Sequence, residues 1–288
     1  MNEAHLFGRV WRVLVGYDDE SGPRRTVLDV SQLDIEFDVA ADITRAPNKA
    51  TIKIWNLGAE KRSNLVAALA DKRRRAVVSL EAGYEDQGAS QIFRGEITAI
   101  RHGRGNVSTS IDIEARDASE ILRSARISQS FAPGTSVEAV VRAAASALGA
   151  GEGNLSAYAS GLTVDGERSF RSGYAASGLA SSVLDDLLRA AGLRWSIQKG
   201  ALQLRRAGGA AIEQAVLLSP QSGLIGSPAP EDKGQVRVQC LLQPSLTPGQ
   251  RVVLKSADYD GGYVIREARF VGATSGGSWH AELLLRPL

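Results

Sequence analysis

The sequence is poor in the residues that build disulfides, metal clusters and catalytic dyads. It contains one cysteine, Cys240, and three histidines among 288 residues. A lone cysteine cannot form an intramolecular disulfide, and counting excludes a zinc site with several cysteine ligands. The histidines His5, His102 and His280 lie in unrelated segments without a motif that would pair a base with a nucleophile. This composition is compatible with folding in a reducing cytoplasm.

Long apolar runs and an excess of one charge are also missing. No segment reaches the roughly 18 consecutive apolar residues of a membrane span, so we expect neither a span nor a signal peptide. The 34 basic and 32 acidic residues give a formal net charge of +2, a weak basis for a dedicated nucleic-acid-binding protein. The basic run 72–75 follows a helix-like segment, and we interpret it as solvated cations near a helix end.

What the sequence does have is alternation of apolar and polar residues in its first and last parts. A period of two is typical of strands with one covered face. One helical stretch, 60–69, interrupts the strands of the first part. The predicted strands are 9–15, 33–39, 51–55, 77–83, 92–101 and 107–115 in the first part, and 216–218, 236–242, 251–256, 263–271 and 279–285 in the last part.

The middle of the chain has a longer apolar period, of three to four residues, that is typical of helices. Thr135–Glu138 offers a capping box for a helix over 137–148. A second helix is predicted over 179–189, and a hairpin follows it, with strands 194–198 and 201–204. The segment 151–173 is rich in glycine and serine, and we expect loops there with one short strand over 162–164.

These elements predict an α+β, mainly β chain, with two small β-barrel domains, of which the first could equally be a sandwich, flanking an α/β middle domain. The length also favours two or three compact units in series. We expect the first barrel, with its inserted helix, over residues 1–122, the middle domain over 123–208 and the second barrel over 209–288.

No catalytic, cofactor-binding or metal-binding residue is predicted, and no cofactor is expected. Cys240 lies in an alternating strand, where a small buried thiol packs well. The acidic pairs Asp185-Asp186 and Asp258 to Asp260 lack the spacing of a calcium loop. The segment 103–105 joins two predicted strands and is interpreted as a turn, because a phosphate-binding loop leads into a helix. The four tryptophans fall on predicted strands and favour packing roles.

One loop is a candidate interface. Its residues are Gly223, Leu224, Ile225, Gly226, Ser227 and Pro228. Apolar residues in a loop of small and turn-forming residues are costly to solvate unless something covers them. Both a neighbouring subunit and the rest of the same domain could provide that cover, and the sequence favours neither.

Several segments together resemble the hub proteins of phage tail baseplates, a family that includes the hubs of related contractile injection machines. Pro47 and Asn48 precede a strand that ends in Asn56-Leu57 ahead of a helix. Further segments of likeness are 81–84 and 92–97 in the first part, and 222–228, 240–244, 248–249 and 262–265 in the last part.

The resemblance implies a structural, non-enzymatic homotrimer. Each subunit would give two barrels to a ring of six that joins a sixfold tail tube to a threefold spike and lines the ejection channel. Its implied partners are the tail tube or a distal tail protein, a spike or tail-tip protein, other baseplate subunits and DNA in transit. The implied location is the virion tail baseplate, after assembly in the host bacterial cytoplasm. The ring requires two separate barrel-like sheets standing side by side in one chain.

Two other kinds of function stay open on the sequence alone. One is a tail-associated enzyme that degrades cell wall or glycans, which would need paired carboxylates in a cleft. The other is a glycan-binding module, which would present a binding surface without turnover.

Overall fold

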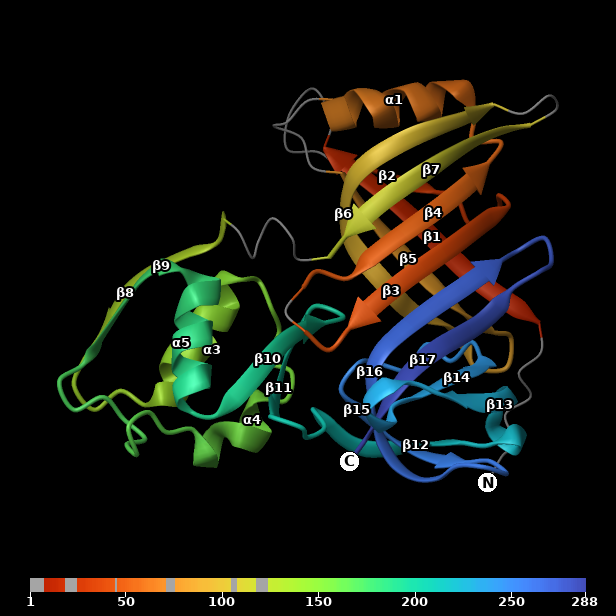
Figure 1. Cartoon of the computed structure of the whole chain (residues 1–288). Coiled ribbons are helices and arrows are strands. Elements are labelled where there is room, and N and C mark those ends of the chain that lie inside the picture. The colour runs from red at the N-terminus through yellow and green to blue at the C-terminus, as the bar shows by residue number, and fades with distance from the viewer. Residues whose placement is uncertain (1–7, 19–24, 45, 71–75, 105–107, 118–123) are drawn as a thin grey trace.

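The computed structural model describes residues 8–18, 25–44, 46–70, 76–104, 108–117 and 124–288 (Figure 1). The basic run 72–75 and His5 lie outside these ranges. Most of the described chain is β-structure, as the alternating pattern predicts. No helix in the described part has the length and apolar character needed to cross a membrane.

Thirteen strands from the first and last parts of the chain form one sheet. Strand pairs within it are antiparallel except for the parallel pair β12–β15. The first part contributes β1 (Arg9–Asp18), β2 (Arg25–Asp29), β3 (Ile35–Asp42), β4 (Lys49–Trp55), β5 (Ala76–Tyr84), β6 (Gly88–Arg104) and β7 (Thr109–Arg116). The last part contributes β12 (Ile212–Leu218), β13 (Leu224–Pro230), β14 (Val236–Leu241), β15 (Gln250–Lys255), β16 (Asp260–Ala273) and β17 (Trp279–Pro287).

The two parts are joined where β3 pairs with β16. Residues 36–42 of β3 lie antiparallel to residues 267–273 of β16, with Glu36 opposite Ala273 and Asp42 opposite Glu267. The path of the sheet therefore runs β13-β14-β17-β16-β3-β4-β7-β6-β5-β1-β2, with β15 and β12 branching from β16. The expectation of two separate barrels is corrected here, because no closed barrel forms among the described strands. Instead, the backbone groups of β3 and β16 form hydrogen bonds with each other and join the two parts in one sheet.

The core lies on one face of this sheet. Alternate residues of each strand point to it, among them Ile52 and Ile113 from the first part and Leu283 from the last, all fully buried. One cluster of apolar side chains includes residues of both parts. Helix α1 (Ala59–Ala70) adds Leu65 and Ala68 to that cluster. The period-two pattern explains this arrangement, because it gives each strand one apolar and one polar face.

An aromatic cluster ties the start of β1 to the join between the two parts. The ring of Trp279 lies edge-on to Phe37 at 5.4 Å and to Trp11 at 6.5 Å between centroids. The guanidinium of Arg9 lies over Trp279 and donates to the carbonyl oxygen of Ala273 at 2.7 Å. Gly272 stands opposite Phe37, and a Cβ there would lie 2.2 Å from the ring, so only glycine leaves room for it.

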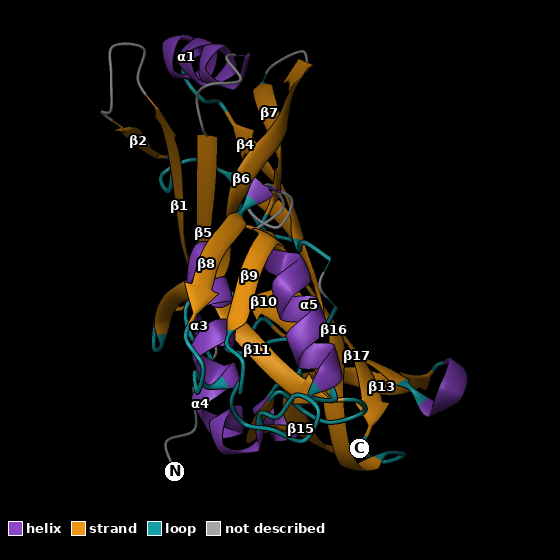
Figure 2. Ribbon diagram, turned by 90° about the vertical axis from the view of Figure 1, so that its left-hand side faces the viewer, coloured by secondary structure: helices purple, strands orange, loops and turns teal. Residues whose placement is uncertain are grey.

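The middle of the chain forms a separate apolar core beside the sheet (Figures 1 and 2). Helices α3 and α5 pack on each other, and the hairpin β10–β11 runs from them toward the sheet. The elements here are β8 (Arg126–Phe131), α3 (Val137–Ala147), α4 (Leu155–Tyr158), β9 (Tyr174–Leu179), α5 (Ala180–Ala190), β10 (Leu193–Gln198) and β11 (Ala201–Arg206). Short 3-10 turns lie at Ala159–Gly161, Pro220–Ser222 and Asp232–Gly234.

Three expectations for the middle part need correction. Ser136, one residue later than expected, caps α3 by accepting from the backbone N–H of Ala139 at 3.2 Å. Ala139 then occupies the position that a capping box needs for glutamate, and Glu138 pairs with Arg142. No strand forms over 162–164, where Val164 makes only an isolated bridge to Glu167. The ribbon β8–β9 was not predicted, because its small polar residues give no alternating signal.

We expect Trp279→Ala to lower the free energy of unfolding by about 3 to 5 kcal/mol, because it removes a 6% exposed ring that packs on both parts of the sheet. Val27→Ala, at a side chain that is 56% exposed, should change it by less than about 0.5 kcal/mol. Chemical denaturation measures both. Equal, small losses would contradict the packing role of Trp279.

Candidate functional site

The face of the sheet opposite the core is polar across seven neighbouring strands, from β14 through β17, β16, β3, β4 and β7 to β6. Residues that stand opposite each other on paired strands point to the same face of the sheet. The strand register therefore identifies which side chains lie on this polar surface. Its charged residues include the acidic Glu36, Asp38, Asp42, Glu96, Asp112, Glu114, Glu267 and Glu282 and the basic Lys49, Lys53, Arg94, Arg101, Arg116, Arg237, Arg269 and Arg286. We call this surface the polar face.

Charges of opposite sign stand next to each other on the polar face. Arg101, Asp112, Lys53 and Glu36 stand opposite one another in turn across β6, β7, β4 and β3, so their signs alternate. Facing pairs of this kind stabilise a sheet by a few tenths of a kcal/mol up to about 1 kcal/mol, whereas like charges destabilise it. This compensation is local, because like charges face each other elsewhere on the polar face, with Lys49 opposite Arg116 and Asp42 opposite Glu267.

The tightest ion pairs of the polar face lie at the join between β3 and β16. Arg269 donates from Nε and Nη2 to both oxygens of Asp38, at 2.9 and 2.6 Å, and from Nη1 to Glu282 at 3.3 Å. The hydrogen bonding of Arg269 to Asp38 is the main reason that the pKa of Arg269 is raised above its usual range. On β6, Arg101 lies 2.8 Å from Glu114. Because these side chains are 32 to 72% exposed, each pair contributes at most about 1 kcal/mol to stability.

Two shallow depressions lie on the polar face. One, of about 370 Å³, lies over the join and is lined by Asp42, Lys49, Arg237, Arg269 and Glu282 among others. The other, of about 550 Å³, lies between the turn 276–278 and the strands β3, β4 and β7. Both are open and lined by groups of mixed sign, so neither has the enclosed apolar lining of a small-molecule site.

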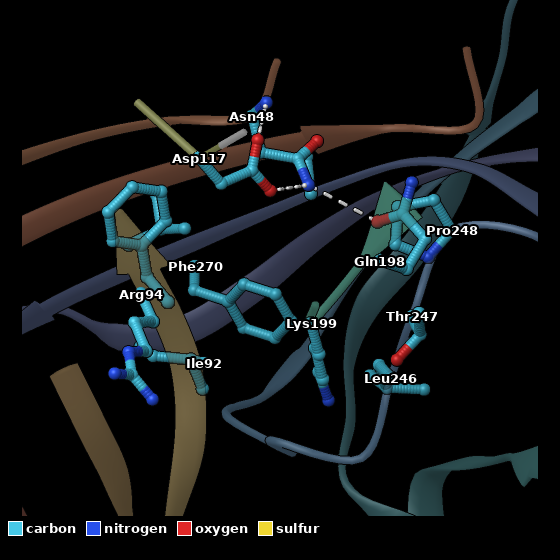
Figure 3. Close-up of a pocket in the computed structure, with 13 residues that line it drawn as sticks. Asn48, Ile92, Arg94, Asp117, Gln198, Lys199, Leu246, Thr247, Pro248 and Phe270 are labelled. Carbon is cyan, nitrogen blue, oxygen red and sulfur yellow. Dashed lines mark hydrogen bonds between the residues drawn. The ribbon is translucent and has the colours of Figure 1, made fainter. Parts of the chain in front are cut away.

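The middle part meets the sheet at a buried polar joint (Figure 3). The tip of the β10–β11 hairpin supplies Gln198, which donates to the carbonyl oxygen of Asp42 at 2.7 Å and accepts from Asn48 Nδ2 at 3.3 Å. Lys199, the next residue, donates to the carbonyl oxygen of Pro244 at 2.5 Å. The hairpin tip therefore contacts both the first and the last part of the chain, next to a cavity of only about 20 Å³.

Asp117 completes the joint. Its carboxylate accepts from the backbone N–H of Asn48 at 2.7 Å and from Asn48 Nδ2 at 2.8 Å. Burial raises the pKa of Asp117 to about 6, although both hydrogen bonds from Asn48 act to lower it. Desolvation wins because a charged carboxylate loses more hydration than two donors return.

The candidate interface loop is an edge strand. Gly223 adopts a left-handed conformation, and Leu224 then begins β13, which pairs with β14. Leu224 is buried by its own chain at 9% exposure, whereas Ile225 is 38% exposed. Ile225 stands opposite Gln239, which continues the polar face to the edge of the sheet. That a neighbouring subunit covers Ile225 stays a prediction.

The other residues that the sequence offered as possible site residues do not come together in one site. His102 is exposed, and His280 lies 3.4 Å from Glu282. Cys240 is fully buried, and burial raises the pKa of its thiol to about 12. Asp185 accepts from the indole N–H of Trp195 at 2.9 Å. In the described part of the chain, no three histidine, cysteine, aspartate or glutamate side chains gather as a metal site would require.

Sequence reasoning missed the polar joint and the composition of the polar face. The alternation in β3, β4, β7 and β16 was a signal for the face, but its charge pairs depend on register between strands far apart in the sequence. Asn48 stood in a segment of family likeness, whereas nothing in the sequence marks Asp117 as buried.

Solved structures of two tail proteins share this fold. The tail protein from Neisseria meningitidis MC58 aligns with a TM-score of 0.57 at 12% identity, over 97% of this chain and 96% of that chain. The 43 kDa tail protein of prophage MuSo2 from Shewanella oneidensis aligns with a TM-score of 0.57 at 10% identity, over 96% of each chain. These alignments show that the chain shares the fold of those two tail proteins.

A family comparison identifies the chain further. The model of the family described as baseplate hub gp41 matches residues 10–274, which is most of the chain. The chain belongs to the baseplate hub gp41 family and is a structural protein of the phage tail, which confirms the resemblance seen in its sequence. Among curated proteins, no significant match was found.

Asp117 should make stability fall with pH. Its pKa in the folded chain, about 6, exceeds the usual 3.8, so between these values the folded state holds a proton that the unfolded state has released. Stability should be highest below about pH 4, fall by about 2 to 3 kcal/mol toward pH 6 and then level off.

Urea denaturation from pH 4 to 7.5 measures this slope. Asp117→Asn should flatten it, while the exposed Asp86→Asn, a matched loss of one carboxyl group, should leave it unchanged. A profile of Asp117→Asn that parallels the parent chain would contradict the assignment.

Proposed function

We propose that the chain is the subunit of a homotrimeric baseplate hub. Three copies form a ring of six tube-type units that joins the sixfold tail tube to the threefold spike and lines the ejection channel. The observation that carries this proposal is the β3–β16 pairing, which joins two strand groups of one chain side by side in a single sheet. Membership in the baseplate hub family supports it.

The proposal differs from its sequence-based form in one respect. That form required two separate sheets, and the described residues have one, so the ring units are the two strand groups of this sheet. We assign the first unit to residues 1–122, the middle domain to 123–208 and the second unit to 209–288. A ring needs two adjacent, similarly sized units in each chain. The pairing of β3 with β16 places the two strand groups next to each other, although neither group is a closed barrel.

The edges of the sheet are the proposed contacts between copies. Within the sheet, β2, β12 and β13 each have one described partner. Each carries an exposed large apolar side chain: Val27, Leu217 and Ile225 respectively. The edges β2 and β13 end the strand path on opposite sides, which suits the head-to-tail interface of a cyclic trimer. Pro228 and Pro230 have no backbone N–H, so β13 lacks two donors for pairing with a further strand. Side-chain contacts therefore contribute more to the proposed contact between copies at β13 than backbone hydrogen bonds do.

The remaining parts of the proposal follow the family. The partners are the tail tube or a distal tail protein, a spike or tail-tip protein and other baseplate subunits, with DNA passing through the ring. The hub needs no cofactor and performs no catalysis, and it assembles in the host bacterial cytoplasm before it becomes part of the virion. The candidate interface residues Gly223 to Pro228 lie at the boundary between copies.

Ile225→Asp should weaken trimer formation by at least about tenfold, because it places a charge in an apolar contact at the sheet edge. Analytical ultracentrifugation over a concentration series of the purified chain measures this. Leu288→Asp is the matched control, since Leu288 is 55% exposed but follows the last strand instead of lying on an edge strand. A parent chain that stays monomeric at all concentrations and in assembled tails would refute the ring.

A further inference from the structure

Three arginines from different strands come together where the middle part of the chain meets the last part. Arg194 on β10 stands directly opposite Arg205 on β11. Arg286 on β17 reaches the connector that follows β11, where its Nη2 donates to the carbonyl oxygen of Gly208. Arg205 interacts electrostatically with both of the other arginines. We call Arg194, Arg205 and Arg286 the arginine cluster.

We propose that the arginine cluster is a binding site for two neighbouring carboxylates on an acidic segment of a partner protein. That the ligand belongs to a partner of the hub rests on the proposed function, whereas the cluster itself is a property of the single chain. Its strands β10, β11 and β17 are not the edge strands proposed as contacts between copies, so the ligand comes from a protein other than a second copy.

The arginine cluster is unfavourable in the chain on its own. Like charges that face each other across an antiparallel strand pair destabilise it, as Arg194 and Arg205 do. Burial, followed by the charges of Arg286 and Arg194, lowers the pKa of Arg205. A self-repelling group of side chains is a common cost of a binding site, because the free protein gives up stability that the ligand restores.

The carboxylates of the chain itself do not neutralise the cluster. Asp42 lies close enough to favour the charged form of Arg205, but its carboxylate accepts a hydrogen bond from the backbone N–H of Thr44. No carboxylate of the described residues forms an ion pair with Arg194 or Arg205. Three cations beside one carboxylate leave two positive charges for a ligand to balance.

Polar atoms on the same side of the hairpin are buried without a partner. Gln203 and Arg205 alternate with Leu204 on β11, so they point to one face. Gln203 Oε1 and Arg205 Nε are shielded from solvent and make no hydrogen bond to a described residue. Buried polar atoms are normally satisfied, so a further molecule is expected to complete this place. Arginine holds a carboxylate through two parallel N–H donors, and Nε is one of the donors suited to this.

The exposure of the cluster favours a carboxylate on a flexible side chain. Arg194 is exposed, whereas Arg205 and Arg286 are only partly exposed. A rigid duplex cannot bring its phosphates to the buried Nε of Arg205. A glutamate or aspartate side chain ends in a small group that can reach it, and two such residues supply the two negative charges. The accessible geometry therefore points to an acidic protein segment.

Succinate and acetate are the first probes, compared at equal ionic strength by thermal melting of the full chain. Succinate carries two carboxylates on a short flexible chain, and acetate carries one. Succinate should raise the melting temperature of the parent chain by at least about 2 °C more than acetate does, because a ligand that binds only the folded state stabilises it.

Two variants assign this shift to the cluster. Arg194→Gln, at an exposed position, should raise the melting temperature in chloride by about 1 to 2 °C, because it relieves repulsion, and should lose at least half of the succinate shift. Arg205→Lys keeps the charge but not the planar donor pair, and should also lose at least half. Arg126→Gln, an exposed arginine on β8, is the matched control and should keep the whole shift.

A pair of short peptides tests the protein source of the ligand. The capped peptide Gly-Glu-Glu-Gly should reproduce the succinate shift of the parent chain, and Gly-Gln-Gln-Gly should give none. Inorganic phosphate at the same ionic strength should give a smaller shift than the glutamate peptide.

Equal effects of succinate and acetate, a full succinate shift in Arg194→Gln or an equal loss in Arg126→Gln would each overturn the site. A larger shift with phosphate than with the glutamate peptide would overturn its assignment to a protein ligand. Sedimentation of the parent chain reports the trimer separately. A monomer with the expected shifts would refute the ring but keep the carboxylate site, and a trimer without them would do the reverse.

Discussion

The pairing of β3 with β16 is the constraint from which the rest of the architecture follows. Seven residue pairs hold segments more than 200 residues apart in one sheet. This pairing satisfies two edges that would otherwise expose backbone donors and acceptors. It also sets the register that brings Phe37 onto Trp279 and Arg269 onto Asp38, one pair on each face. A slip by one residue would exchange the two faces and place charge in the core.

The middle part is attached to this sheet by polar contacts, and that attachment carries a cost. Gln198, Asn48 and Asp117 satisfy one another in a nearly closed space. A buried carboxylate with neutral partners destabilises the folded chain once it ionises, which a fully apolar contact would avoid. The polar contacts fix the orientation of the middle part, because the hydrogen bonds of Gln198 specify where the tip of the β10–β11 hairpin must lie. A fixed orientation between the parts suits a subunit that has to fit into a ring.

The polar face combines solubility with neutrality. Its carboxylates keep a wide sheet surface wet, while its arginines and lysines prevent a large field of one sign from forming. The ion pairs add little stability, because they are half exposed.

The sequence by itself determined the local structure. Alternation predicted most strands and their apolar sides, the apolar period and the cap signal at Thr135–Glu138 predicted α3, and scattered segments identified the family. It did not determine that the two β-rich parts share one sheet, since edge pairing depends on backbone groups that every strand carries. Nor did it reveal that Asp38 meets Arg269 or that the partly buried Asp117 meets Asn48. Those contacts depend on register between distant strands, and only the tertiary structure decided it, because local periodicity sets which face a residue takes but not its neighbours across the sheet.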